Sequence, residues 1–141
     1  GTNLRFTDVQ AALGLYQLNE LPVRLARRRA SYHAMRDRLG DRLLTVPGDE
    51  APLHNVVLTS RADDAAAARR AQGILAVRQY RTLSQHPAYR HLADRPYPNA
   101  DHWTDRAVYL PFGMAMMPDD AIRVADALIA SGVACEALST S

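Results

Sequence analysis

Lysine is absent from this chain of 141 residues, in which all 17 basic residues are arginine. The single cysteine, Cys135, has no internal partner for a disulfide, so nothing in the sequence indicates an oxidising compartment. No apolar run approaches the roughly 20 residues that span a bilayer, and no signal-peptide pattern opens the chain. These absences favour a cytoplasmic protein that does not enter a membrane.

The residues that are present suit one ordinary folded domain. Hydrophobic residues make up 48% of the chain and charged residues 23%, with a net charge of +2. A chain of this length buries roughly two-thirds of its surface on folding, so a core can form without disulfides or metals. The chain opens on Gly1 and reaches a helix signal at Thr7. We therefore expect it to be part of a longer polypeptide.

Two helices are predicted at the start of the chain. Thr7 and Gln10 have the spacing of a capping box, which predicts a helix from about Asp8. Apolar residues follow on several sides of this helix, so we expect it to be largely buried. Pro22 is tolerated in a first helical turn, which predicts a second helix from about Leu21 to Leu39. Arg28 lies within its apolar stripe, which suggests a partner surface or a snorkelling stem.

The rest of the chain mixes strand and helix signals. Short β-branched segments predict strands at Leu53–Thr59, Ile74–Val77 and Ala107–Leu110. Helices are predicted at Asp63–Gln72 and from Pro118 to Gly132, and residues 79–105 form a long loop with short helices near His86 and Ala100. This order predicts an α+β fold with a small sheet. Residues 1–40 would form a helical segment and residues 41–141 the small domain.

The residues from Gly1 to Leu18 resemble a signature of the DegT/DnrJ/StrS family, which reads G-x-N-x-R-x-(T/S)-(D/E)-x-x-A-A-x-G-x-x-Q-L. The resemblance continues at Arg27–Arg29 with Tyr32, at Tyr80 with His86–Tyr89, at Pro98–Asp101, at Tyr109–Pro111 and at Asp119–Leu128. The family consists of nucleotide-sugar aminotransferases that use pyridoxal 5'-phosphate (PLP). The resemblance implies the small C-terminal domain of a fold type I PLP enzyme, with two N-terminal helices and a mainly antiparallel sheet flanked by helices.

The absence of lysine sets this chain apart from its family. Family members hold PLP through a lysine, and an arginine guanidinium cannot replace that amine because it stays protonated. We therefore expect the chain alone to be inactive, with no catalytic residue of its own, and the cofactor to be attached through a lysine outside it. The family loop also reads Pro-Leu-His after its tyrosine, whereas Tyr80 is followed here by Arg81, Thr82, Leu83 and Ser84.

Four residues are candidate binding residues by resemblance. Asn3 would contact the phosphate of the neighbouring subunit's PLP; the ordinary alternative is a loop residue that forms a local turn. Arg5 would bind an anionic part of the substrate, or else pair with an acid such as Asp8. Tyr80 and His86 would lie near the sugar. Their ordinary alternatives are a tyrosine packed in the core and a cap for the following helix.

Other ligand classes receive little support. The five histidines have no metal-site spacing, which predicts no metal site. Arg24, Arg27, Arg28 and Arg29 lie on a nearly neutral chain without interleaved aromatic residues, so we expect no nucleic acid. The predicted function is transfer of an amino group from glutamate or glutamine to a keto sugar, nucleotide sugar or keto cyclitol, within a homodimer. The alternatives are a non-catalytic partner or regulatory domain, and a sugar dehydratase of the same family.

Overall fold

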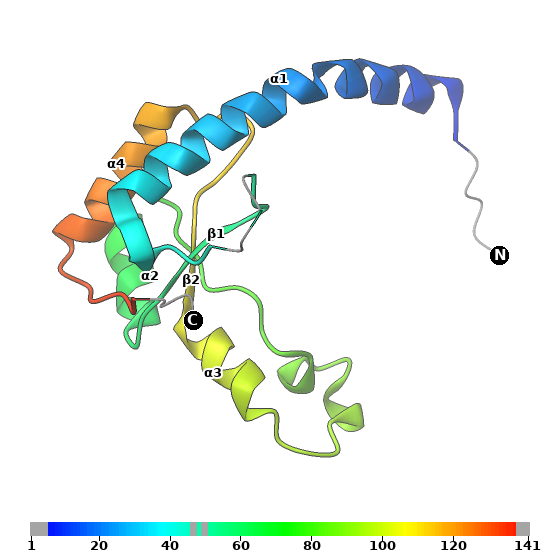
Figure 1. The fold of residues 1–141 in the computed structure, drawn as a ribbon. Helices are drawn as coiled ribbons and strands as arrows, with labels where there is room; N and C mark the ends of the chain where they lie inside the picture. The colour runs from blue at the N-terminus through cyan, green and yellow to red at the C-terminus, as the bar shows by residue number, and fades with distance from the viewer. Residues whose placement is uncertain (1–5, 46–47, 49–50, 138–141) are drawn as a thin grey trace.

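The structure is a computed structural model that describes residues 6–45, 48 and 51–137. Its element order is α1 (Asp8–Leu39), η1 (Gly40–Arg42), β1 (Asn55–Leu58), α2 (Ala62–Ala71), η2 (Leu83–Gln85), η3 (Arg90–Leu92), α3 (Pro98–Arg106), β2 (Ala107–Leu110) and α4 (Pro118–Ala130). Figure 1 shows α1 extending as an arm from one end of the molecule, while α3 and the segment before it project at the other. None of the described helices is long and apolar enough to cross a membrane.

The two predicted N-terminal helices are one continuous helix, α1, of 32 residues. The capping box of Thr7 and Gln10 is confirmed, and Gly40 ends the helix with a φ of +60° that favours glycine. The expectation of a break at Pro22 is wrong. Pro22 removes one backbone donor, but it and Leu18, four residues earlier, are both exposed, so water can reach the carbonyl that loses its partner.

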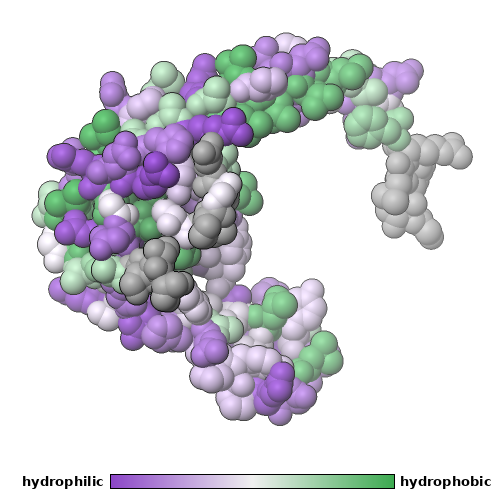
Figure 2. Space-filling view, in the orientation of Figure 1, coloured by the Kyte–Doolittle hydropathy of each residue, from purple (hydrophilic) through white to green (hydrophobic). Residues whose placement is uncertain are grey.

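The prediction that the first part of α1 is largely buried is also wrong. Val9 is 71% exposed, Leu13 60% and Tyr16 61%. The buried residues of this helix begin only at Arg28 and continue through Tyr32 and Leu39. Figure 2 shows hydrophobic surface along the extended arm. Helical periodicity marks which residues are apolar, whereas burial depends on whether another element lies against them.

A two-stranded antiparallel sheet lies at the centre of the fold. Strand β1 pairs with β2 in a register that sets Asn55 opposite Leu110 and Leu58 opposite Ala107. The predicted strand at Ile74–Val77 is absent, and only Val77 forms a bridge, to Tyr109. The N–H of Ala76 donates to the carbonyl of Ile74 at 2.9 Å, so a tight turn uses a donor that a strand would present to its neighbour.

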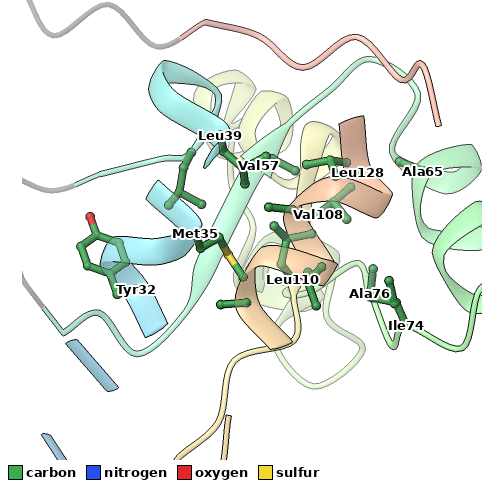
Figure 3. Close-up of a cluster of buried hydrophobic side chains, with 14 of the residues drawn as sticks. Tyr32, Met35, Leu39, Val57, Ala65, Ile74, Ala76, Val108, Leu110 and Leu128 are labelled. Carbon is green, nitrogen blue, oxygen red and sulfur yellow. The ribbon is translucent and has the colours of Figure 1, made fainter. Parts of the chain in front are cut away.

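The main core lies on one face of this sheet, between α1, α2 and α4. Val57 and Val108 point into it and meet side chains from α1 and α4, as Figure 3 shows. The buried side chains from the helices include Tyr32, Met35, Leu39, Ala65, Val124 and Leu128. A smaller cluster on the opposite face contains Val56, Leu58 and Ala107. This alternation is what the two-residue period of a strand dictates.

Candidate functional site

Two of the four predicted binding residues, Asn3 and Arg5, lie outside the described residues. Their roles at the phosphate and at an anionic part of the substrate therefore stay predictions. The other two, Tyr80 and His86, lie in the described segment between α2 and α3. The structure gives these two residues different surroundings.

Tyr80 belongs to a cluster of three rings with His54 and Tyr109, which we call the aromatic cluster. The centroids of Tyr80 and Tyr109 are 5.7 Å apart at 80°, and those of His54 and Tyr109 are 5.3 Å apart at 83°. The third pair, His54 and Tyr80, lies at 5.9 Å and 62°. All three pairs are edge-to-face contacts, which are favourable between aromatic rings. Tyr80 itself is 61% exposed, so its ordinary alternative, a core tyrosine, does not describe it.

The sheet assembles this cluster from three separate segments. His54 directly precedes β1, and Tyr109 lies on β2 opposite Val56. Two hydrogen bonds between Val77 and Tyr109, of 2.9 and 3.1 Å, bring the segment that carries Tyr80 alongside β2. Sequence reasoning missed His54 and Tyr109 as site residues, because their proximity depends on strand pairing across more than fifty residues of chain.

Arg28 fixes the backbone just before His54. Its guanidinium donates to the carbonyls of Pro52 and Leu53, at 2.9 and 2.7 Å, and lies 4.4 Å above the ring of Phe112. The side chain is 7% exposed. The sequence suggested that Arg28 is a snorkelling stem or part of a partner surface. Neither interpretation fits, because the guanidinium is buried and bonded within the chain. Arg28 is instead a buried donor that joins α1 to the chain entering β1.

Tyr109 is the least exposed of the three aromatic residues. Burial raises the pKa of its phenol, and the neighbouring Tyr80 raises it further. The Tyr109 hydroxyl therefore remains protonated at neutral pH. Together with the exposed edges of His54 and Tyr80, the cluster offers hydrogen-bond donors and acceptors to a polar ligand.

His86 lies outside the aromatic cluster. Its ring packs against Tyr89, with centroids 5.5 Å apart, and its Nδ1 accepts a hydrogen bond from the N–H of Ala88 at 3.3 Å. This local contact corresponds to the ordinary alternative of a cap for the following turn. Among the described residues, the His86 ring contacts Tyr89 and makes no ring contact with Tyr80.

A polar cavity of about 370 Å³ adjoins Tyr80. Arg78 organises it: its guanidinium donates to both carboxylate oxygens of Asp63 at 3.0 Å and to the carbonyl of Asp105 at 3.2 Å. These contacts join the beginning of α2 to the end of α3. The terminal N–H groups of Arg78 are used inside the protein, whereas its buried Nε has no hydrogen-bond partner among the described residues. Tyr80, Arg81 and Gln85 also line the cavity and offer polar groups to a ligand.

Metal-binding groups do not converge within the described part of the chain, where no three His, Cys, Asp or Glu side chains are placed to share an ion. Cys135 is half-buried, and burial raises the pKa of its thiol despite the neighbouring Arg42 and Arg69. A thiol of that kind is less reactive than an exposed one, because the thiolate is the nucleophile.

Comparison with known proteins shows which family and which solved structures this chain resembles. The model of the DegT/DnrJ/EryC1/StrS aminotransferase family matches residues 1–129. The sugar aminotransferase CalS13 from Micromonospora echinospora superposes with a TM-score of 0.79 at 22% identity, over 94% of this chain and 37% of that one. DesV from S. venezuelae, solved in complex with a ketimine intermediate, superposes with a TM-score of 0.78 at 28% identity. The match covers 91% of this chain and 37% of DesV. No curated protein matches the chain.

A third solved structure, Helicobacter pylori PseC, an aminotransferase involved in the biosynthesis of pseudoaminic acid, gives a TM-score of 0.78 at 19% identity. The match includes 93% of this chain and 38% of PseC. This chain therefore spans little more than a third of the structures that it matches. The shared architecture is that of the fold type I aminotransferases, which confirms the predicted fold class. The chain belongs to the DegT/DnrJ/EryC1/StrS aminotransferase family.

Proposed function

We propose that this chain forms part of a PLP-dependent sugar aminotransferase. The reaction would move an amino group from glutamate or glutamine to the keto group of a nucleotide sugar or cyclitol. The observation that carries the proposal is the family match over residues 1–129, together with a sugar aminotransferase fold over more than nine-tenths of the chain. The polar cavity and the aromatic cluster supply a surface that suits a hydroxylated substrate.

The residues of this chain do not make a complete PLP site by themselves. PLP, when bound, supplies an aldehyde that is held by an amine and a ring that accepts electrons during transamination. The chain has no lysine to hold that aldehyde, and its buried guanidiniums of Arg28 and Arg69 are committed to protein acceptors. The reactive amine of the proposed enzyme therefore comes from polypeptide outside these 141 residues.

The contribution of this chain would be to bind and orient the substrate. Tyr80 is exposed beside the polar cavity, where its hydroxyl can hold a sugar hydroxyl. Asn3 would hold the cofactor phosphate of the neighbouring subunit, and Arg5 an anionic group of the substrate, as the sequence motif implies. His86 would lie near the sugar, although its Nδ1 already accepts from the backbone.

The proposed enzyme is a homodimer, and residues 1–40 would link the small domain, residues 41–141, to a large domain and to the dimer interface. The support for this is the apolar face of α1 that no described residue covers. Val9, Leu13 and Tyr16 share this face at helical spacing and are each at least 60% exposed, and Leu15 and Leu18, on other sides of the helix, are equally exposed. Burying such a face removes apolar area from water at about 25 cal/mol per Å², which favours a covering surface.

A non-catalytic partner or regulatory domain is the main alternative, and the absence of lysine is the observation that favours it. A dehydratase of the same family is the second alternative within the enzyme class. An independent regulatory domain would be expected to cover its apolar helix face, whereas α1 leaves it exposed. The exposed face therefore favours the aminotransferase.

The cross-subunit role of Asn3 provides the test, in the protein that includes the lysine-bearing polypeptide. We expect Asn3→Ala to lose PLP on gel filtration, because a donor to the phosphate is removed, whereas the matched variant Asn19→Ala, exposed on α1, should retain it. Mixing the Asn3→Ala chain with a chain that lacks the lysine should restore about one active site per dimer.

Two results would contradict the proposal in different ways. Loss of PLP without rescue on mixing would exclude the contact across subunits. A protein that neither binds PLP nor aminates any keto sugar, while remaining folded, would instead support the non-catalytic alternative.

A further inference from the structure

A second cavity, which adjoins the polar one and shares Arg81 and Thr104 with it, lies within residues 81–106, which we call the lobe. Its volume is about 730 Å³, within the range of small-molecule sites. Figure 1 shows the lobe standing away from the main core, at the opposite end of the molecule from the arm of α1. The cavity is lined mainly by apolar and aromatic side chains, among them Leu83, Tyr89, Leu92, Ala93 and Tyr97.

The hydroxyl groups of the cavity wall are largely engaged within the protein. Thr82 donates to Asp101 at 3.1 Å, and Thr104 donates to the carbonyl of Tyr80 at 3.3 Å. Ser84 donates to Thr82 at 3.0 Å, and Tyr97 donates to Asp94 at 3.2 Å. A sugar, which needs many free donors and acceptors, therefore finds few partners here.

Arg81 is the exception among the lining residues. It is exposed, it lines both the apolar and the polar cavity, and no acceptor among the described residues pairs with its guanidinium. No carboxylate side chain lines the apolar cavity. Residues 81–106 contain four arginines and three aspartates, so the lobe carries a net charge of +1. Arg81 is the only charged residue that lines the apolar cavity, and its guanidinium favours an anion there.

We propose that the cavity of the lobe binds a planar aromatic group that carries one anionic substituent. The ring lies against the apolar wall formed by Leu83, Leu92 and the tyrosines, and the anion pairs with the guanidinium of Arg81. The proposal goes beyond the sugar-binding role proposed above, because it assigns a different ligand chemistry to a different cavity. It does not depend on whether the chain is catalytic.

The dye 8-anilinonaphthalene-1-sulfonate has this chemistry and serves as the probe on the 141-residue chain. Its neutral relative N-phenyl-1-naphthylamine tests the contribution of the charge. The only tryptophan, Trp103, lies on α3 next to the lining residue Thr104, so energy transfer from Trp103 reports dye bound in the lobe. This readout distinguishes the lobe from the exposed apolar face of α1.

We expect Arg81→Gln to weaken the anionic dye about tenfold and to leave the neutral dye unchanged, because only the ion pair is lost. The matched control Arg90→Gln removes an exposed arginine of the same lobe that does not line the cavity, and it should retain full affinity. Leu92→Asp places a charge in the apolar wall and should weaken both dyes more than tenfold. Leu92 is 66% exposed, so this variant should still fold.

Phenyl phosphate and phenylacetate, added as competitors, distinguish a phosphate from a carboxylate as the preferred anion, and displacement of the dye by either supports the proposal. Equal losses in Arg81→Gln and Arg90→Gln would overturn it, because they would show unspecific attraction to the lobe. Dye binding without energy transfer from Trp103 would also overturn it. Dye binding that falls as the chain dimerises would overturn it as well, because a second copy of the chain would then fill the cavity.

Discussion

Buried arginines show how single residues decide the surroundings of the site. Arg28 lies within an apolar stripe of the sequence, but its guanidinium donates hydrogen bonds to the carbonyls of Pro52 and Leu53, next to His54. Arg69 is fully buried, and burial lowers its pKa, while its guanidinium donates to Ser131 at 2.5 Å. Burying a charge is costly unless hydrogen-bond acceptors meet it, so both positions depend on their partners, although the buried Nε of Arg69 has none among the described residues.

The Arg28 contact gives a prediction about stability. We expect Arg28→Met to lower the free energy of unfolding by about 1–3 kcal/mol, because the methionine keeps much of the apolar stem but leaves the part-buried carbonyls of Pro52 and Leu53 without this donor. The control Arg29→Met changes an exposed arginine on the same helix and should stay within about 0.5 kcal/mol of the native chain. Urea denaturation measures both. Equal stabilities of the two variants would contradict the role given to Arg28.

At the scale of elements, local sequence patterns predicted the position of helices and strands well, but they did not predict that α1 is continuous. The strand at Ala107–Leu110 was predicted with the bounds that the structure shows, because β-branched and aromatic residues end there at Pro111. The helix Asp63–Gln72 is observed as Ala62–Ala71. The break at Pro22 was wrong, since a proline lowers the stability of a helix without determining whether the next turn continues it.

Pro22 therefore predicts a weak point in α1. Because proline costs about 3 kcal/mol in a helix interior, Pro22→Ala should raise helical content and slow the amide exchange of residues 8–21. The matched control Val23→Ala alters the neighbouring exposed residue without restoring a backbone donor, and it should change exchange little. Circular dichroism and hydrogen exchange test this. Unchanged exchange in Pro22→Ala would show that α1 is already fully stable there.

The aromatic cluster was only partly predictable at this scale. The family motif identified Tyr80 as a candidate, but His54 precedes one strand and Tyr109 lies in another. Neither has a local sequence signal for binding, and their meeting with Tyr80 depends on the β1–β2 register and on the bridge at Val77. A contact between residues far apart in the chain requires knowledge of strand pairing, which a local pattern does not contain.

At the scale of the whole molecule, the chain has a packed core at its centre and unpaired surfaces at both ends. Figure 2 shows the hollow outline between the arm of α1 and the lobe. The core joins α1, the sheet and α4, whereas the first part of α1 packs against no second layer among the residues that the structure describes. A domain normally buries the apolar stripe of a helix against another element, so this surface indicates association.

That surface predicts how the isolated chain behaves in solution. We expect the 141-residue chain to associate as its concentration rises, and the double variant Leu13→Glu, Tyr16→Glu to stay monomeric, because the two glutamates place charge on the apolar face. Sedimentation velocity measures the outcome. The control Leu75→Glu changes a residue that is 67% exposed elsewhere and should associate like the native chain. A native chain that stays a single monomeric species would contradict the covering surface proposed for α1.

The sequence by itself determined the family resemblance, the α+β class, the capping of α1 and the lack of an amine for a Schiff base. These properties depend on residue identity and on spacing within a few turns of chain. Only the tertiary structure decided that the arm of α1 is uncovered, that Arg28 is a buried donor, and that His54, Tyr80 and Tyr109 meet. Each of these depends on which distant segments lie side by side, and packing across the whole chain sets that arrangement.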